Sequence, residues 1–217
     1  MTSFPDPPFL ILILVVIGLV PFIAVIATAY VKIVVVMQLL RNALGIQQIP
    51  PTMTMQGLAI ILTIYIMAPI GLQSFQILAQ RDLAALKGPE LVATLGTAAE
   101  PFRGFLARFA APRHRAFFLE TAHKLWPPEA TKDLDDKHFL ILLPAFTVSE
   151  LTNAFEIGFL LYLPFIAIDL VISNILMAMG MMMVSPMTIS LPFKLLLFVM
   201  LDGWTRLLQG LVLSYVP

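Results

Sequence analysis

The chain has 217 residues, of which 59% are hydrophobic and only 12% are Asp, Glu, Lys or Arg, about half the charged fraction of an ordinary soluble domain. So little charge does not cover a solvated globular surface, which excludes a simple soluble enzyme, and 13 basic against 13 acidic residues exclude the broad positive field of a nucleic-acid-binding protein. Because the chain has no cysteine, disulfides and thiolate metal sites are also excluded.

Long uncharged runs predict membrane-spanning helices. They lie between Asp6 and Lys32, between Arg41 and Arg81, and between Asp169 and Lys194. Each run exceeds the roughly 20 helical residues that cross a bilayer. No Lys or Arg precedes the first run, so we expect a span over 9–30 rather than a cleaved signal peptide.

After the first span, turn-forming residues predict a change of direction. Gly45 and the pair Pro50–Pro51 indicate a loop or sharp bend at 45–52. A long apolar helix is then predicted over 53–80, with Pro69 inside it.

The middle of the chain is different in composition. Residues 81–138 hold most of the charged residues, and their prolines predict short amphipathic helices over 81–88, 90–110 and 113–125. All three histidines also lie here, at His114, His123 and His138. Their spacing fits no metal site, so we expect solvated surface histidines, with no metal and no cofactor.

From residue 139 the chain is again apolar, with breaks expected near Ser185–Pro186 and Pro192. We therefore divide it into N-terminal apolar helices at 1–80, a charged, water-facing helical segment at 81–138, and C-terminal apolar helices with a Met-rich loop at 139–217. The predicted fold class is an all-α membrane protein of long broken helices and helical hairpins.

Ionisable residues inside the apolar stretches need a partner or a watery surface, because an isolated charge in hydrocarbon is unfavourable. Asp202 and Arg206 are four residues apart, so they are predicted to form a structural ion pair on one helical face. The other candidates for buried ionisable groups are Glu150, Glu156, Asp169 and Lys194. A proton-relay or ion-coupling role for Glu156 or Asp169 is the functional alternative.

Methionine is concentrated in one place: six of the chain's twelve lie between Met177 and Met187. The consecutive residues Met181, Met182 and Met183 would point about 100° apart on a helix, so they do not serve one packing stripe. Gly180 before them suggests a loop or a broken helix. A surface that adapts to varied partners and a gap-filling role in an apolar core both remain open.

No catalytic signature is present, so we expect no enzyme.

The charge distribution also gives no consistent membrane topology. Lys32 and Arg41 would place the loop at 32–52 in the cytoplasm, and one further crossing would place the basic segment 81–138 outside. The helices are therefore not all ordinary lipid-facing spans.

Long motifs resemble a known family. They are KIVVVMQLLRNALGIQQIPP at 32–51, MQGLAIILTIYIMAP from Met55, and the stretch from LLPAFTVSELTNAFEIGF to LDGW in the C-terminal part. These segments resemble the FliP/SctR (YscR, HrcR) family of type III secretion export-gate proteins over about 30–80 and 139–215. The short N-terminus and Gln47–Gln48 are more similar to the virulence injectisome branch than to the flagellar one.

The resemblance implies a core component of a type III export gate in the bacterial inner membrane, multi-pass and partly protruding to the periplasmic side. It implies a pentamer that assembles with FliQ/SctS-family and FliR/SctT-family subunits and other export apparatus proteins into an oligomeric helical pore. Unfolded secreted proteins would pass through this pore, and membrane lipid would surround it. The family's methionine gasket would correspond to Met181, Met182 and Met183.

Two other functions are weighed against this expectation. Without the resemblance, the residues also fit a small oligomeric solute or ion transporter that uses Glu156 and Asp169. An intramembrane enzyme lacks a recognisable nucleophile or metal set.

Overall fold

The computed structural model describes residues 14, 18, 19, 21–46, 49–80, 88–181 and 183–216, and this part of the chain is helical without strands. The predicted all-α fold is therefore confirmed. The helices are α2 (Tyr30–Leu44), α3 (Thr52–Ala79), α4 (Gly88–Ala98), α5 (Glu100–Phe109), α6 (Pro112–Leu125), α7 (Pro128–Thr131), α8 (Phe139–Ala178), α9 (Pro186–Met200) and α10 (Gly203–Leu213).

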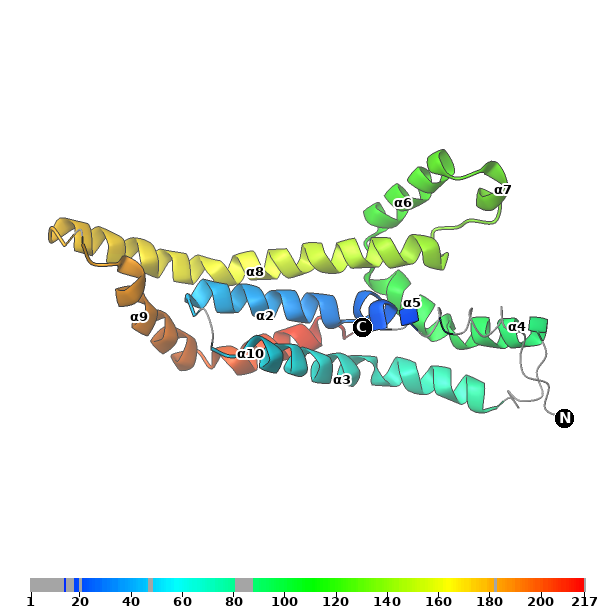
Figure 1. The fold of residues 1–217 in the computed structure, drawn as a ribbon, viewed down its shortest axis with the longest axis horizontal. Coiled ribbons are helices and arrows are strands. Elements are labelled where there is room, and N and C mark those ends of the chain that lie inside the picture. Colours follow the sequence, from blue (N-terminus) through cyan, green and yellow to red (C-terminus); the bar gives the residue numbers. More distant parts are fainter. Residues whose placement is uncertain are drawn as a thin grey trace.

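The 40-residue helix α8 runs along most of the molecule, and α2 packs along it in the same direction (Figure 1). Helix α3 lies against the opposite side of α2, and α9 turns back from the far end of α8. The short helices α5 and α6 pack against the first half of α8. Because α2 and α8 are parallel, a long connection through α3 to α7 is needed to join them.

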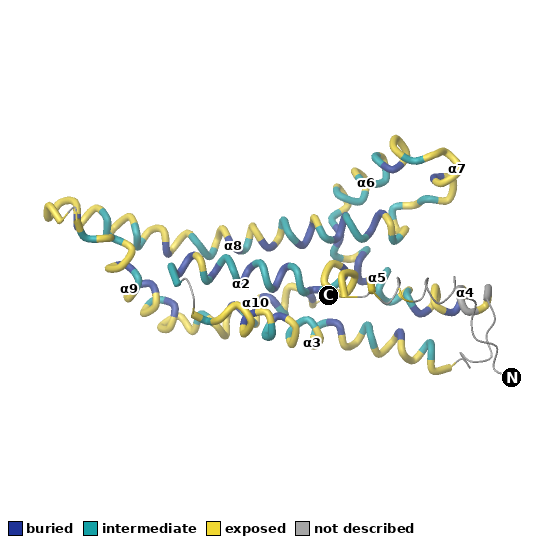
Figure 2. The backbone as a smooth tube through the Cα atoms, in the orientation of Figure 1, coloured by how far each residue is buried: buried dark blue, intermediate teal, exposed yellow. Residues whose placement is uncertain are grey.

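Helix α2 forms the centre of the core. Its buried residues Ile33, Val36, Met37, Leu40 and Leu44 are at most 3% exposed. They recur at intervals of three and four residues, which places them on one side of the helix. Figure 2 shows buried and half-buried residues along α2 and buried residues in the first half of α8. The residues that follow the first predicted span are thus core, not a loop between spans.

One hydrophobic cluster joins the three segments into which we divided the sequence. Phe105 and Leu106 of α5 pack in the same cluster as α2 and as Leu142 and Phe146 of α8. The rings of Phe105 and Phe146 are 5.5 Å apart between centroids. The charged segment is therefore attached to the apolar helices by a shared core.

Prolines both begin helices and lie within them. Pro112, Pro128 and Pro186 lie in the first turn of α6, α7 and α9, where the missing amide hydrogen costs no helical bond. Pro69 lies inside α3 as predicted. The break predicted near Pro192 is wrong, because α9 continues through it and loses only one internal hydrogen bond.

Two predicted helices are interrupted. The expected span over 9–30 is helical at 21–26, but a break at 27–29 precedes the start of α2, and most of its earlier residues lie outside the described ranges. At the break, the Thr28 hydroxyl donates to the Ala24 carbonyl and accepts from the Tyr30 amide. The interval 90–110 holds two helices, which separate at Ala99. Most of the helix expected at 81–88 also lies outside the described part.

The bend predicted at 45–52 is confirmed. Gly45 ends α2 with φ of +76°, a left-handed conformation that favours glycine, and α3 begins at Thr52.

Two described helices, α3 and α8, are long and apolar enough to cross a membrane. A third span is possible by length if α9 and α10, which meet at 60°, are taken together.

Helices α2 and α8 approach each other closely at Gly158. A Cβ added at this position would lie 2.2 Å from Leu39 Cδ1 and 3.1 Å from Leu39 Cβ. Moving the tip of Leu39 does not relieve the second contact, so the larger side chain forces the helices apart. Gly158 is therefore required by close packing rather than by backbone conformation.

We expect Gly158→Ala to lower the free energy of unfolding by about 1–3 kcal/mol, the usual effect of overpacking a helix interface. The measurement is denaturant unfolding of the purified protein in mild detergent. Gly57→Ala in α3 is the matched control, since a Cβ there meets no atom within 4 Å. The control should be neutral or slightly stabilising. Equal unfolding free energies for the two variants would contradict the packing argument.

Candidate functional site

Helix α8 ends in a tight turn. The Gly180 amide donates to the Met177 carbonyl at 3.0 Å, and the Met181 amide donates to the Leu176 carbonyl at 2.9 Å. This pair of bonds is the Schellman motif, and Gly180 has the left-handed φ of +73° that the motif requires. Helix α9 then begins at Pro186. The predicted break at this point in the sequence is confirmed.

The turn presents methionines on the surface. Met183 is fully exposed, and Met181 is 40% exposed. Met182, the third residue of the predicted gate, lies outside the described residues. The other exposed methionines around the turn are Met177, Met179 and Met187. We call this surface the methionine tip.

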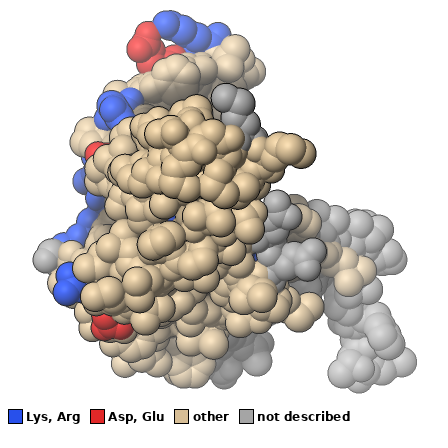
Figure 3. Space-filling view, turned by 90° about the vertical axis from the view of Figure 1, so that its left-hand side faces the viewer, with Lys and Arg blue, Asp and Glu red and all other residues tan. Residues whose placement is uncertain are grey.

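The methionine tip lies on an almost uncharged end of the molecule. Figure 3 faces this end, and its Lys, Arg, Asp and Glu side chains are confined to one margin and the top of the view. A tip of flexible thioether side chains without nearby charge offers an apolar surface that changes shape at low cost.

A partly buried ion pair holds the two helices that carry the tip. Lys194 Nζ of α9 lies 2.6 Å from Asp169 Oδ2 of α8, and the Ser190 hydroxyl donates to Asp169 Oδ1 at 2.6 Å. Lys194 Nζ also donates to the Ala43 carbonyl at the end of α2, at 3.2 Å. A cation there satisfies a terminal carbonyl and interacts favourably with the helix dipole. Lys194 therefore connects three helices.

This cluster supports the tip from close by. Asp169 is nine residues from the end of α8, which is about 13 Å along a helix. Because Lys194 is only 2% exposed, its charge depends on these partners for compensation. We call Asp169, Ser190 and Lys194 the hairpin clamp.

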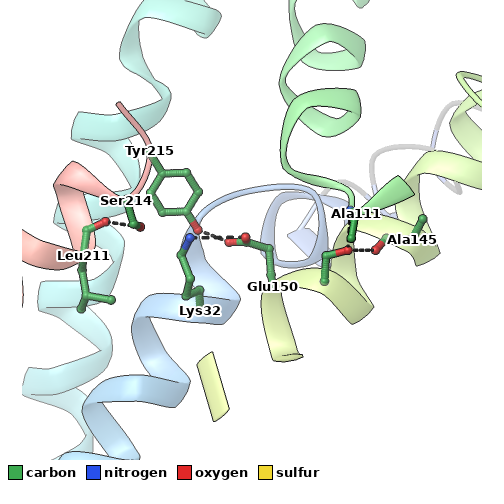
Figure 4. A network of polar contacts seen from close by, with 8 residues as sticks. Lys32, Ala111, Ala145, Glu150, Leu211, Ser214 and Tyr215 are labelled. Atoms are coloured by element: carbon green, nitrogen blue, oxygen red, sulfur yellow. Dashed lines mark hydrogen bonds and ion pairs between the residues drawn. The ribbon is translucent and has the colours of Figure 1, made fainter. Parts of the chain in front are cut away.

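A second ion pair, in which both side chains are buried, joins α2 to the first half of α8 (Figure 4). Lys32 Nζ lies 3.3 Å from Glu150 Oε1. The Tyr215 hydroxyl donates to Glu150 Oε2. Lys32 Nζ lies over the face of the Tyr215 ring, 3.7 Å from the ring centroid. The three residues come from α2, α8 and the C-terminal end, so these contacts hold the C-terminal end against α2 and α8.

Beside Glu150, a hydroxyl fastens the start of α6 to α8. The Ser149 hydroxyl donates to the Ala145 carbonyl and accepts from the Ala111 amide (Figure 4). His114 Nδ1 lies 2.8 Å from the same oxygen and must donate, because the hydroxyl proton is already used. Desolvation, followed by the charge of Arg113, lowers the pKa of His114 below its ordinary value. His114 is therefore a partly buried structural residue and not the solvated histidine that we predicted.

The predicted buried ionisable residues divide into two groups. Glu150 and Lys194 are buried and paired, and Asp169 is partly buried and paired. Glu156, in contrast, is exposed on α8 and has no cation within 4.0 Å among the described residues.

The predicted ion pair between Asp202 and Arg206 does not form in the described chain. Asp202 precedes α10 with a left-handed φ of +51°, so it is not on the same helical face as Arg206. Its carboxylate accepts instead from the Thr205 hydroxyl at 2.9 Å. The prediction failed because it assumed one continuous helix where α9 and α10 meet in a bend. Asp202–Gly203 is a turn-forming dipeptide that signals this bend.

Sequence reasoning also missed three partners. Lys32 was read as the charged flank of a span, whereas it is buried against Glu150. Tyr215 and Ser190 lie far along the chain from the carboxylates that they contact. The sequence indicated that each embedded charge needs a partner, but it did not indicate which residue the partner is.

In the described residues, no group of three His, Asp or Glu side chains could hold a metal ion. Two apolar cavities are lined by helices of the core, one of about 660 Å³ beside α3 and one of about 420 Å³ between α8, α9 and α10. Neither cavity is lined by a cluster of titratable groups that would suggest catalysis.

Comparison with known proteins gives one family. The model of the FliP family matches residues 13–211. The chain is 55% identical to the Yop proteins translocation protein R of Yersinia pestis over 215 residues, 99% of both chains. It is 49% identical to the hypersensitivity response secretion protein HrcR of Ralstonia nicotianae, over 95% of this chain and 96% of that one. Identity to the virulence protein YscR of Salmonella typhimurium is 46%, over 98% and 99% respectively.

For the hairpin clamp, we expect Asp169→Asn to destabilise the protein more than Lys194→Met does. The first variant leaves a buried ammonium without its counter-ion, whereas the second leaves a carboxylate that is about one-third exposed. Thermal and denaturant unfolding in detergent of both variants and the double variant should give a coupling of about 1–3 kcal/mol.

Lys124→Met is the matched control, because the ion pair of Lys124 with Glu120 is exposed on α6. It should leave stability unchanged, since exposed pairs contribute little. An effect of Lys194→Met no larger than that of Lys124→Met would show that the clamp does not stabilise the hairpin.

Proposed function

The chain belongs to the FliP family and is a non-enzymatic membrane component of a type III secretion apparatus, and from this we propose that copies of it form the pore of the export gate in the bacterial inner membrane. In this proposal the copies form a pentamer with FliQ/SctS-family and FliR/SctT-family subunits. Secreted proteins pass unfolded through the pore, and part of the assembly protrudes on the periplasmic side.

The observation that carries the proposal is the methionine tip. A channel for unfolded chains needs a constriction that seals when idle and deforms around any side chain in transit. Unbranched thioethers combine apolarity with many accessible rotamers, whereas β-branched side chains are stiffer at χ1. We assign this constriction to Met181, Met182 and Met183.

The exposure of the tip supports this assignment over a role in the core. Met183 has no contact that covers it, and the neighbouring described methionines are also exposed. The hairpin clamp lies behind them and holds α8 against α9. A soft tip on a fixed hairpin is suited to a gate whose position is constant and whose surface is variable.

A second observation supports assembly with other subunits. Large hydrophobic side chains are exposed along α3, α8 and α9, far beyond what a water-soluble monomer presents. Lipid and partner subunits are the surroundings that cover such surfaces.

The alternative of a small ion or solute transporter has less support. Asp169, one of its two candidate carboxylates, is bound to Lys194 and Ser190 and does not stand free on a path. A relay also needs several converging titratable groups, and Glu156 is the other candidate by itself.

We expect the triple change of Met181, Met182 and Met183 to Ala to leave the complex assembled and to make the membrane leaky to small ions several-fold above background. Protein secretion should largely persist. Exposed side chains contribute little packing, whereas truncating buried methionines would cost roughly 2–5 kcal/mol per site. The measurements are native electrophoresis of the complex, ion flux across the inner membrane and the amount of secreted protein.

Met53→Ala is the control, because Met53 is also highly exposed but lies at the start of α3. It should change neither flux nor assembly. If the triple variant fails to assemble and shows no change in flux, these methionines belong to the packed core and the gate is assigned wrongly.

A further inference from the structure

Two exposed charges of opposite sign have no ion-pair partner within the described part of the chain. Glu156 is exposed on α8, and Arg206 is exposed on α10. The five described ion pairs, at a limit of 4.0 Å, include neither residue. All other charges embedded in the C-terminal apolar helices have polar partners inside the chain, including Asp202 with Thr205.

The surroundings of Glu156 are apolar. Phe155, Phe159 and Leu160 are its neighbours on α8 at intervals of one, three and four residues, and all three are exposed. A carboxylate in such a patch is unfavourable against hydrocarbon. The composition of the patch therefore indicates a protein surface that brings its own cation.

Arg206 lies at an apolar groove that is complementary in charge to the surface around Glu156. It lines the cavity of about 420 Å³ between α8, α9 and α10, and it is the one charged residue in that lining. The remaining lining is almost entirely apolar and includes Ile157, Leu161 and Leu207. The groove could receive an apolar side chain and place a carboxylate at the guanidinium.

The two surfaces lie on different sides of the molecule. Ile157 and Leu161, which line the groove, are four residues apart and share one side of α8. Glu156 precedes Ile157 by one residue and is therefore rotated by about 100° on the helix. Phe155 and Phe159, also four residues apart, lie further round on the side away from the groove. One chain therefore carries two complementary surfaces. One is an apolar surface of α8 that includes the carboxylate of Glu156, and the other is an apolar groove that includes the guanidinium of Arg206.

We propose that Glu156 of one copy pairs with Arg206 of the next copy, with Phe159 of the first copy in the groove of the second. This contact rests on the proposed function, in which copies assemble around a pore. Because it joins two different surfaces, it is heterologous, and repetition of such a contact generates a ring or a helical spiral. A self-complementary two-fold dimer would need one surface for both roles.

The test uses the absence of cysteine in the chain. Glu156→Cys is placed in a copy with one affinity tag and Arg206→Cys in a copy with another, and both are expressed with the secretion apparatus in bacterial membranes. A short bismaleimide linker should join them into a covalent dimer that carries both tags. Since each copy has one cysteine, a product with both tags must be intermolecular.

Glu156→Cys combined with Leu125→Cys is the matched control. Leu125 is 74% exposed but lies at the end of α6, beside neither surface. This pair should give no product with both tags.

Charge reversal tests the ion pair itself. Glu156→Arg and Arg206→Glu should each lower the yield of the oligomer about tenfold, because each places like charges together. The double variant, which restores opposite charges at every contact, should recover most of the yield. Failure of the double variant to recover, together with absence of the cross-link, would overturn the contact.

The outcomes separate this inference from the proposed function. An intact oligomer of the unmodified protein without the Glu156–Arg206 cross-link overturns the contact and leaves the pore standing. Failure of the unmodified protein to form any oligomer overturns the pore itself. If Arg206→Glu removes a co-purifying anionic phospholipid and leaves the oligomer intact, the groove is a lipid site and the contact is wrong.

Discussion

The structure depends on the alignment of α2 with α8, and the buried pair of Lys32 and Glu150 fixes that alignment. Both side chains are at most 3% exposed, so each charge would be strongly unfavourable without the other. A slip of one helical turn, about 5.4 Å, would separate them and leave two uncompensated charges in the core. The Tyr215 hydroxyl completes the pair and brings the C-terminal end to the same point. The pair therefore disfavours any other register of the two helices.

One further contact along α2 repeats this register, and another connects α2 to α9. Leu39 packs on Gly158, and the Ala43 carbonyl accepts from Lys194. From Lys32 to Leu39 the chain advances seven residues, and from Glu150 to Gly158 it advances eight, as expected for parallel helices in side-by-side contact. The last contact transfers this fixed position to α9 and so to the hairpin clamp. A soft surface at the methionine tip is useful only if the hairpin beneath it does not move, and α2 supplies that support.

The sequence predicted local features much better than long-range pairing. Gly180 and Pro186 predicted the turn that carries the methionines, because both residues act on their own backbone. The hairpin clamp was not predictable, since Asp169 and Lys194 are 25 residues apart and nothing in the sequence of either segment identifies the other residue as its partner. Lys32 and Glu150 are 118 residues apart, and only the fold brings them together. The wrong pair, Asp202 with Arg206, came from treating a bent segment as one helix.

The distribution of the remaining charge separates two kinds of exposed apolar surface. Helix α3 has 28 residues without an ionisable side chain other than Tyr65, and Ile60, Ile61 and Ile64 are exposed along it. No charged side chain in that surface conflicts with hydrocarbon. The exposed side of α8 is similarly apolar but contains Glu156, and the groove beside α10 contains Arg206. Hydropathy alone treats these surfaces alike, whereas in the proposed assembly the cost of an unpaired charge in lipid would place α3 on the outside and the charged faces of α8 and α10 at the contacts between copies.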